Sequence, residues 1–219
     1  MSSAGDARSR MDRMYRLQRH FYDLTRKFYL FGRDALIKSL VVKPGETMCE
    51  VGCGTARNLI LLARKNPGAR FFGVDASAEM LKTAAAHVAR ACLAGNIRLA
   101  PSLAQEFDGG RLFGLTGPFD RLLYSYSLSM MDDWRAAVAH GLTQLKPGGS
   151  LYIVDFGDQK RMPRWFKTLM GAWLDKFHVR FRPEIRDYFA ACARAGRGRM
   201  TYREIMRGYA YLLTFETAV

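Results

Sequence analysis

The chain has 219 residues, enough for one domain with appendages but short for two full domains. Its 49% hydrophobic and 25% charged residues exclude general disorder, and no apolar run approaches the roughly 18 residues that a membrane-spanning helix needs. The net charge of +14 is uneven, with +5 in residues 1–33, +1 in residues 34–158 and +8 in residues 159–219. Basic flanks around a neutral centre predict contact with an anionic partner, either a phospholipid surface or nucleic acid.

The first predicted element is a basic amphipathic helix over residues 1–34. On a helical wheel its aromatic and aliphatic residues share one side, and its arginines gather on the other. Such a helix can lie in a membrane interface. The alternative is a lid whose apolar face packs over a site while its basic residues are solvated. The two interpretations are compatible, because part of the face can cover a site while its edge meets lipid.

Residues 35–219 are expected to form one α/β domain. From Lys43 to Phe156, short apolar runs alternate with helical periodicity, which indicates a doubly wound, mainly parallel seven-stranded sheet. The predicted strands of this part are Thr47–Val51, Phe71–Asp75, Ile97–Pro101, Phe119–Tyr124 and Leu151–Phe156. The predicted helices are Asn58–Lys65, Ala78–Cys92 and Trp134–Leu145, the second with Ser77 as its N-cap. A turn is expected at Lys146–Gly149.

A basic, aromatic-rich insertion is expected around residues 159–199. It contains predicted helices at Pro163–Phe177 and Arg186–Arg194, followed by a turn at Gly196–Arg199. Trp165, Phe166 and Trp173 alternate with basic residues in the first helix, which suits either a buried core or a second interfacial element. Thr201–Ile205 and Tyr209–Phe215 then predict an antiparallel hairpin that closes the sheet.

Residues 48–56, MCEVGCGTA, join an apolar strand to a glycine turn that opens a helix. The turn needs glycines where a ligand approaches the backbone. Asp75 ends the next strand, where a carboxylate can accept both hydroxyls of a ribose. Glu50 argues against a dinucleotide, because its charge would oppose a pyrophosphate at the helix N-terminus. A ligand that carries an ammonium and a sulfonium would be attracted by that charge.

With FDRLLYSYSLSMM (119–131) and LKPGGSLYIVDF (145–156), this stretch resembles class I S-adenosylmethionine-dependent methyltransferases, which have a Rossmann-like sheet. The resemblance implies S-adenosylmethionine as cofactor and S-adenosylhomocysteine as product. It implies that Glu50, Gly52, Gly54 and Thr55 lie beside the methionine part and that Asp75 holds the ribose. It also implies that Ala76, Ser102, Leu103 and Ala104 surround the adenine, and that residues 124–126, Ser125 included, face the methyl group. Ala56 replaces the usual last glycine, and Leu103 stands where many relatives have an aspartate.

Residues 15–34 together with EVGCGTARNL (50–59) resemble the bacterial N-methyltransferases that make the betaine head group of diacylglyceryl trimethylhomoserine. Phosphatidylethanolamine N-methyltransferases are close relatives. The resemblance implies successive N-methylation of diacylglyceryl homoserine, and a separate upstream enzyme that transfers the aminocarboxypropyl group. It leaves phosphatidylethanolamine as the alternative acceptor.

Aromatic rings stabilise a sulfonium and a quaternary ammonium by cation–π attraction, so Tyr22, Tyr126 and Tyr15 are the candidate residues of the methyl-transfer cavity. A homoserine carboxylate or a phosphate suits a guanidinium, for which Arg26, Arg180 and Arg182 are candidates. For each of these residues the competing interpretation is structural: packing on the sheet for the tyrosines and a solvated surface charge for the arginines.

The remaining alternatives are an RNA methyltransferase, a small-molecule amine methyltransferase and a scaffold without turnover. The segment Tyr124–Ser127 lacks the Asp-Pro-Pro-Tyr loop of many base-amino methyltransferases, and no RNA-binding module is recognisable, so we expect no nucleic-acid partner. No metal site is expected, since the cysteines and histidines lack zinc-type spacing, and Cys49 and Cys53 are predicted to be buried thiols. Unpaired cysteines and a start without a signal-peptide core predict a cytoplasmic protein, peripherally bound to the inner face of the cell membrane. The oligomeric state is left open.

Overall fold

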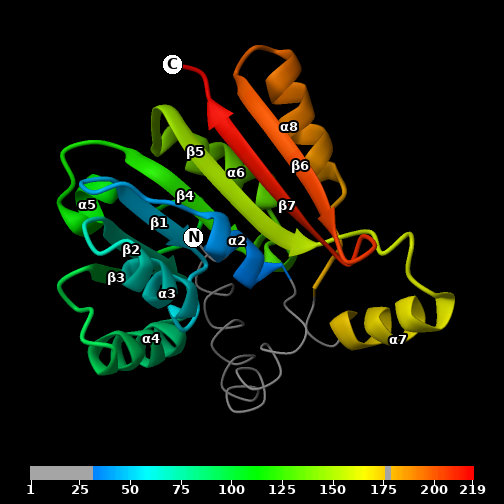
Figure 1. The fold of residues 1–219 in the computed structure, drawn as a ribbon, viewed down its shortest axis with the longest axis horizontal. Coiled ribbons are helices and arrows are strands. Elements are labelled where there is room, and N and C mark those ends of the chain that lie inside the picture. The colour runs from blue at the N-terminus through cyan, green and yellow to red at the C-terminus, as the bar shows by residue number, and fades with distance from the viewer. Residues whose placement is uncertain (1–31, 176–178) are drawn as a thin grey trace, which may run out of the picture.

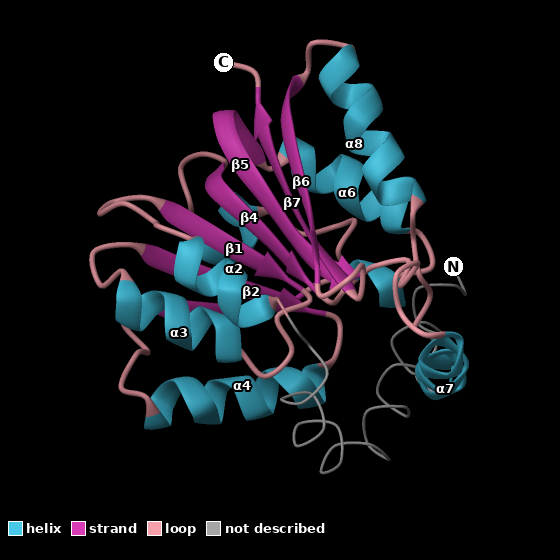
Figure 2. Ribbon diagram, turned by 45° about the vertical axis from the view of Figure 1, so that its right-hand side comes forward, coloured by secondary structure: helices cyan, strands magenta, loops and turns pink. Residues whose placement is uncertain are grey.

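The computed structural model describes residues 32–175 and 179–219, and it contains one mixed seven-stranded sheet between two layers of helices (Figures 1 and 2). The strands are β1 (Thr47–Val51), β2 (Arg70–Asp75), β3 (Ile97–Pro101), β4 (Phe119–Ser125), β5 (Leu145–Phe156), β6 (Gly198–Ile205) and β7 (Ala210–Thr217). Their order across the sheet is β3-β2-β1-β4-β5-β7-β6. The first five run parallel, and β7 pairs antiparallel with β5 and β6. The predicted fold and the closing hairpin are therefore confirmed.

Helices cover both faces because both faces of the central strands are apolar. The helices are α2 (Arg33–Ser39), α3 (Arg57–Lys65), α4 (Ala78–Arg90), α5 (Gly109–Phe113), α6 (Trp134–Thr143), α7 (Arg164–Asp175) and α8 (Glu184–Arg194), with a short 3₁₀ helix, η1 (Leu128–Met130). Helices α2, α3 and α4 pack with one core cluster, while α5, α6 and α8 pack with the other. Burial of Cys49 and Cys53 confirms the prediction for these thiols.

The local signals placed most boundaries within a few residues. The Ser77 hydroxyl accepts a hydrogen bond from Met80 N and caps α4, as predicted. The prediction of a separate turn at Lys146–Gly149 is wrong, because β5 begins at Leu145 and includes these residues. The pairing of β5 with β4 is irregular between Phe119 and Arg121. The pattern also gave no indication of α5 or η1, whose few residues are too short to show helical periodicity.

The boundary expected between residues 34 and 35 falls inside α2. Among the described residues of the insertion expected around residues 159–199, helix α7 stands apart from the layers, whereas α8 packs on the sheet through Ile185, Phe189 and Cys192. Among the described residues, no helix has the length and apolarity needed to cross a bilayer.

Candidate functional site

The candidate site lies at the carboxyl edge of the parallel strands, between the neighbouring strands β1 and β4. The sheet continues from β1 to β2 and β3 on one side, and from β4 to β5 on the other. The chain leaves β1 and β4 in opposite directions at this point, and a crevice at such a switch point is the usual ligand site of an open α/β sheet. Glu50 and Asp75 reach this edge from β1 and β2, and Ser125 ends β4. The sequence prediction that these residues share one edge is therefore consistent with the sheet topology.

The glycine turn after β1 is held against β2. The backbone N–H groups of Gly52 and Cys53 both donate to Val74 O, at 2.8 and 3.0 Å. Gly52, Gly54 and Ala56 all have left-handed backbones, with φ of 75°, 53° and 61°. A Cβ on Gly52 would lie 2.7 Å from the Ser127 Cβ, so the turn and the start of η1 approach as closely as a glycine allows.

Asp75 connects the end of β2 to this turn. One carboxylate oxygen accepts from Gly54 N at 2.8 Å, and the other accepts from Ser77 N at 2.9 Å. The side chain is buried at the end of β2, where a carboxylate can accept the hydroxyls of a ribose. Asp75 is thus oriented by the backbone before any ligand arrives.

Glu50 is almost fully buried, with 1% of its surface exposed, and accepts from Asn58 Nδ2 at 2.6 Å. The sequence analysis gave Asn58 no role. The signal was its place in the first turn of the helix that follows the glycine turn, where a side chain can reach back over β1. Because a buried carboxylate needs hydrogen-bond donors, Asn58 positions Glu50 in the site.

The residues expected around the adenine follow β2 and β3. Ser102, Leu103 and Ala104 are buried, and Ser102 N donates to Asp75 O at 3.1 Å, which ties the end of β3 to the end of β2. Ala76 is half-buried and Thr55 is buried. Because the Leu103 side chain is apolar, another group must accept a hydrogen bond from the adenine amino group.

The three residues at the end of β4 point in different directions. Tyr124 lies on the α6 side, where its hydroxyl donates to Ala137 O at 2.9 Å, so the expectation that it faces the methyl group is wrong. Strand alternation sends only Ser125 to the other face of the sheet. The Ser125 Oγ is buried and has no hydrogen-bond partner among the described residues. Tyr126 has an uncommon φ of 53°, and its ring lies 4.7 Å from the Phe156 ring on the α2 side.

The segment after α7 runs along η1 and brings two predicted arginines to the site. Arg180 N donates to Ser129 O at 2.9 Å, and the Arg182 guanidinium donates to Met131 O at 3.0 Å. The Arg180 side chain is exposed, whereas Arg182 is half-buried and its Nε has no hydrogen-bond partner in the described part of the chain. Arg182 is therefore the better placed of the two to meet an anionic group.

Asp155 is a buried carboxylate that the sequence analysis did not single out. It lies near the end of β5 and accepts from Ser129 N at 3.0 Å, which fixes the start of η1 beside the glycine turn. Burial raises the pKa of Asp155 to about 6, although hydrogen bonds from the η1 backbone oppose this shift. Its only sequence signal was an acidic residue inside an otherwise apolar strand.

Tyr15, Tyr22 and Arg26 lie outside the described residues. The described residues nonetheless fit S-adenosylmethionine on three grounds: a turn in which Gly52 admits no side chain, a buried carboxylate pair formed by Glu50 and Asp75, and the unpartnered Ser125 Oγ. Glu50, Gly52, Gly54 and Thr55 would hold the methionine part, and Asp75 would hold the ribose.

Comparison with known proteins supports the same family. Residues 49–151 match the family described as "Methyltransferase domain". Demethylmenaquinone methyltransferase of Corynebacterium efficiens is 31% identical over 140 residues, which cover 62% of this chain and 54% of that protein. Trans-aconitate 2-methyltransferase of Deinococcus radiodurans is 31% identical over 111 residues, covering 51% of this chain and 38% of that protein. The match to each of these relatives thus spans about half of its length or less.

Solved structures share the fold at low sequence identity. An O-methyltransferase family protein from Burkholderia thailandensis has a TM-score of 0.62 at 19% identity, covering 97% of this chain and 60% of that one. YcgJ from Bacillus subtilis has a TM-score of 0.63 at 16% identity, covering 85% of this chain and 98% of that one. The match over residues 49–151 and the seven-stranded sheet thus show a Rossmann-like, S-adenosylmethionine-dependent methyltransferase fold in this chain.

Proposed function

We propose that the protein transfers methyl groups from S-adenosylmethionine to the amine of a membrane lipid head group, preferentially diacylglyceryl homoserine. The observation that carries this proposal is the place of Arg182 along η1, with a half-buried guanidinium beside the carboxyl edge that holds Tyr126. A guanidinium at the mouth of a methyl-transfer site suits an acceptor that carries both an amine and an anionic group.

When bound, S-adenosylmethionine supplies a methyl group on a sulfonium, which a neutral amine displaces directly. The protein's own residues then have to align the amine and exclude water. Tyr126 serves as the ring beside the cationic groups, where cation–π attraction contributes roughly 0.5–2 kcal/mol. Burial raises the pKa of its hydroxyl well above 10, so Tyr126 does not act as a phenolate base near neutral pH. The proton of the ammonium leaves to water before attack.

Phosphatidylethanolamine is the alternative acceptor, because its phosphate offers Arg182 the same anionic contact. A second candidate comes from the sequence relative that methylates demethylmenaquinone, which would make the acceptor a membrane-dissolved quinone. In all three cases the acceptor resides in a bilayer, and we propose peripheral binding to the inner face of the cell membrane. For the homoserine lipid, a separate enzyme must first transfer an aminocarboxypropyl group to diacylglycerol.

The test is transfer of radiolabelled methyl groups from S-adenosylmethionine into extracted lipid. Diacylglyceryl homoserine, phosphatidylethanolamine and demethylmenaquinone are offered in separate anionic vesicles, with transfer RNA and a water-soluble amine as controls. We expect label in the homoserine lipid. Label only in phosphatidylethanolamine or only in the quinone would correct the acceptor, and label only in RNA or the soluble amine would overturn the proposal.

Arg182→Lys separates a guanidinium contact from a general positive charge. We expect the KM for the lipid to rise about tenfold or more, since Lys cannot make the paired contact, while cofactor affinity stays unchanged. Arg186→Lys on the exposed side of α8 is the matched control. An unchanged KM in Arg182→Lys would remove this residue from the acceptor site.

A further inference from the structure

Helix α7 stands apart from both helical layers, on the side of the molecule where the parallel strands end (Figures 1 and 2). One side of the helix attaches it to the body. Phe166 and Met170 pack against the core, with 6.1 Å between the ring centroids of Phe166 and Tyr209 and 4.0 Å between the Tyr209 hydroxyl and the Met170 sulfur. These contacts account for one face of α7 only.

The other face presents an apolar stripe to solvent. Trp165 is 68% exposed and Leu169 is 66% exposed, and their spacing of four places them one turn apart on the same side of the helix. No other large apolar side chain in a helix or strand of the described residues is as exposed as these two. A tryptophan and a leucine whose side chains are exposed next to each other indicate a binding surface.

Basic residues border this stripe and indicate its partner. Lys160 and Arg161, just before α7, and Arg164, its first residue, are all exposed. Asp158 and Glu204 pair with the first two, at 2.8 and 3.4 Å, and these exposed pairs are weak enough for a phosphate to compete. Apolar and aromatic side chains flanked by Lys and Arg suit the interface of an anionic bilayer, where the rings lie at head-group depth and the cations meet phosphates.

A row of aromatic rings connects this face to the candidate site. It runs from Tyr126 to Phe156, Tyr209, Phe166 and Trp165, with successive centroids 4.7, 6.0, 6.1 and 5.9 Å apart. Contact of α7 with a bilayer would therefore bring the end of β4 close to the lipid surface. An acceptor head group could then reach the site while its acyl chains stay in the membrane.

We infer that α7 is a membrane-docking helix, which inserts Trp165 and Leu169 among the head groups of an anionic phospholipid bilayer. The role of this docking in acceptor delivery rests on the proposed function. The docking itself is measurable without turnover.

The experiment is co-sedimentation of the full chain with vesicles of phosphatidylcholine alone or with phosphatidylglycerol, comparing wild type with the Trp165→Ser/Leu169→Ser variant. Val41→Ser is the matched control, because Val41 is 60% exposed in the segment between α2 and β1. We expect the double variant to lose about tenfold or more in binding to anionic vesicles. Val41→Ser should bind as wild type does, and both variants should keep cofactor affinity and the unfolding midpoint.

Charge is tested separately with Arg161→Gln/Arg164→Gln against Arg64→Gln/Arg90→Gln, which removes two exposed arginines from α3 and α4. Only the first pair should weaken binding and reduce its salt dependence. Brominated lipids should quench fluorescence less in Trp165→Phe than in wild type at equal binding.

Undiminished vesicle binding by the Trp165→Ser/Leu169→Ser variant would overturn the inference. Vesicle binding that requires α7 without methylation of any lipid would refute the proposed function and leave the docking role intact. Undiminished vesicle binding and undiminished lipid methylation in the double variant would refute the docking role and leave the proposed function intact.

Discussion

Asp155 shows how a single buried charge can organise a site and weaken the fold at the same time. Its carboxylate orders the backbone at the start of η1, yet burial raises its pKa to about 6. The Tyr126 and Tyr211 hydroxyls near it stay protonated, because burial and the Asp155 charge raise their pKa. A carboxyl group whose pKa is raised on folding binds protons more tightly in the folded state, so its contribution to stability falls as pH rises from about 4 to 6.

We expect Asp155→Asn to remove this pH dependence. As the pH rises from 4 to 7, wild type should lose about 2–3 kcal/mol of unfolding free energy relative to the variant. This is the value of a shift of about two pKa units. Urea unfolding of both proteins at several pH values measures this difference. The contributions of the titratable groups that the two proteins share cancel in it. Parallel stability curves for the two proteins would contradict the assigned pKa.

Asp75 carries a second residue-scale prediction. Asp75→Ala should abolish measurable S-adenosylmethionine binding in calorimetry, because the substitution removes the ribose acceptor and the acceptor for Gly54 N and Ser77 N. Asp132→Ala, an exposed carboxylate after η1, is the control and should bind normally. Cofactor affinity within threefold of wild type in Asp75→Ala would refute the assignment.

At the scale of the element, α3 begins under a conformational constraint that its sequence conceals. Ala56, its N-cap residue, has φ of 61° and ψ of 20°, is fully buried, and caps the helix without a side-chain hydrogen bond. The left-handed conformation costs a residue with a Cβ about 1–2 kcal/mol, whereas a buried methyl group contributes about 0.8 kcal/mol. These two effects nearly balance, which explains why alanine is tolerated where glycine is usual.

The balance predicts opposite outcomes for two substitutions. Ala56→Gly should stay within about 1 kcal/mol of the wild-type unfolding free energy, while Ala56→Val should lose about 2 kcal/mol or more, because a β-branched residue fits this conformation poorly. Urea unfolding measures both, and Ala85→Val on the exposed side of α4 gives the ordinary cost of valine in a helix, about 0.5 kcal/mol. Equal losses in Ala56→Val and Ala85→Val would contradict a constrained start of α3.

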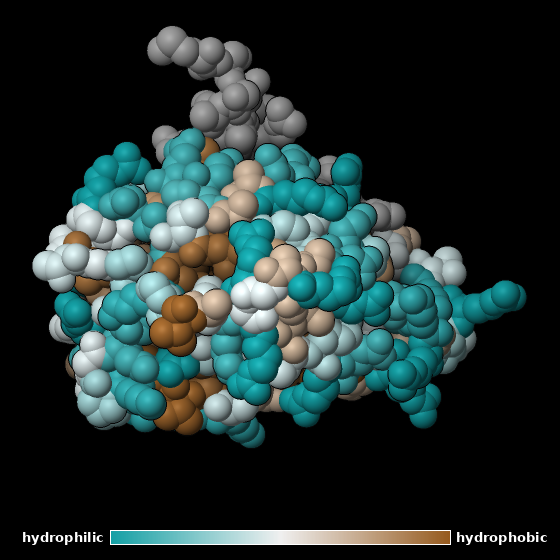
Figure 3. All heavy atoms as spheres, turned by 90° about the horizontal axis from the view of Figure 1, so that it is seen from above, coloured by the Kyte–Doolittle hydropathy of each residue, from teal (hydrophilic) through white to brown (hydrophobic). Residues whose placement is uncertain are grey.

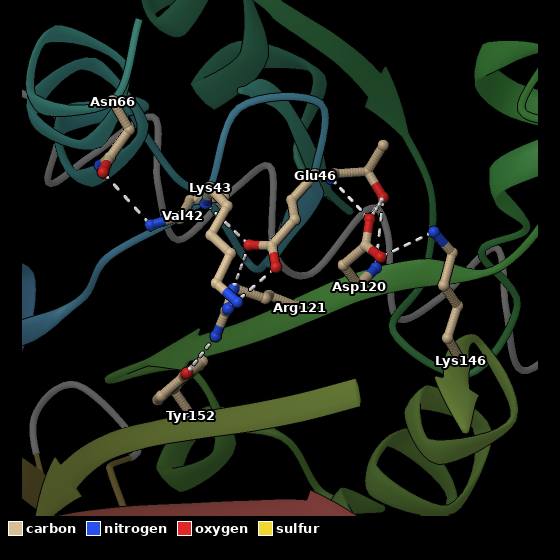
Figure 4. Close-up of polar contacts among 9 residues, drawn as sticks. Val42, Lys43, Glu46, Asn66, Asp120, Arg121, Lys146 and Tyr152 are labelled. Carbon is tan, nitrogen blue, oxygen red and sulfur yellow. Dashed lines mark hydrogen bonds and ion pairs between the residues drawn. The ribbon is translucent and has the colours of Figure 1, made fainter. Parts of the chain in front are cut away.

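At the scale of the whole molecule, the two edges of the parallel sheet have different roles. The amino edge is clamped by polar contacts (Figure 4). Arg121 donates to both Glu46 oxygens at 2.8 and 3.1 Å and to the Tyr152 hydroxyl at 2.6 Å, joining the residues before β1 to β4 and β5. Asp120 accepts from Thr47 and from Lys146 close by.

The side of the molecule seen from above, away from α7, presents mainly hydrophilic side chains around smaller apolar patches (Figure 3).

Arg121→Met should therefore lower global stability without affecting the site. We expect a loss of about 2 kcal/mol, less than for a fully buried ion pair because both partners are partly solvated, with cofactor affinity unchanged. Burial alone would raise the pKa of Glu46, but hydrogen bonds from Arg121 and the Lys43 backbone lower it, so this stabilisation is present near neutral pH and lost on acidification. Urea unfolding measures the loss of stability, and calorimetry measures the cofactor affinity. A loss of cofactor affinity equal to the loss of stability would contradict separate roles for the two edges of the sheet.

The sequence by itself determined the sheet, most helices and the ligand class. Alternating apolar runs specify buried parallel strands, and a glycine turn followed by an acidic strand end specifies a nucleoside site, because both signals depend on residues close together in the chain. The same local character explains why the position of Asp75 at the end of β2 and the Ser77 cap could be predicted.

Only the tertiary structure decided which side chains reach the site. Tyr124 and Tyr126 are two residues apart, but Tyr124 bonds to α6 while the left-handed backbone of Tyr126 turns its ring toward Phe156. The contacts of Asp155 and Arg182 with the η1 segment join positions 26 and 51 residues apart. Such contacts leave no periodic trace, because they arise from the way separate elements pack rather than from the order of residues within one element.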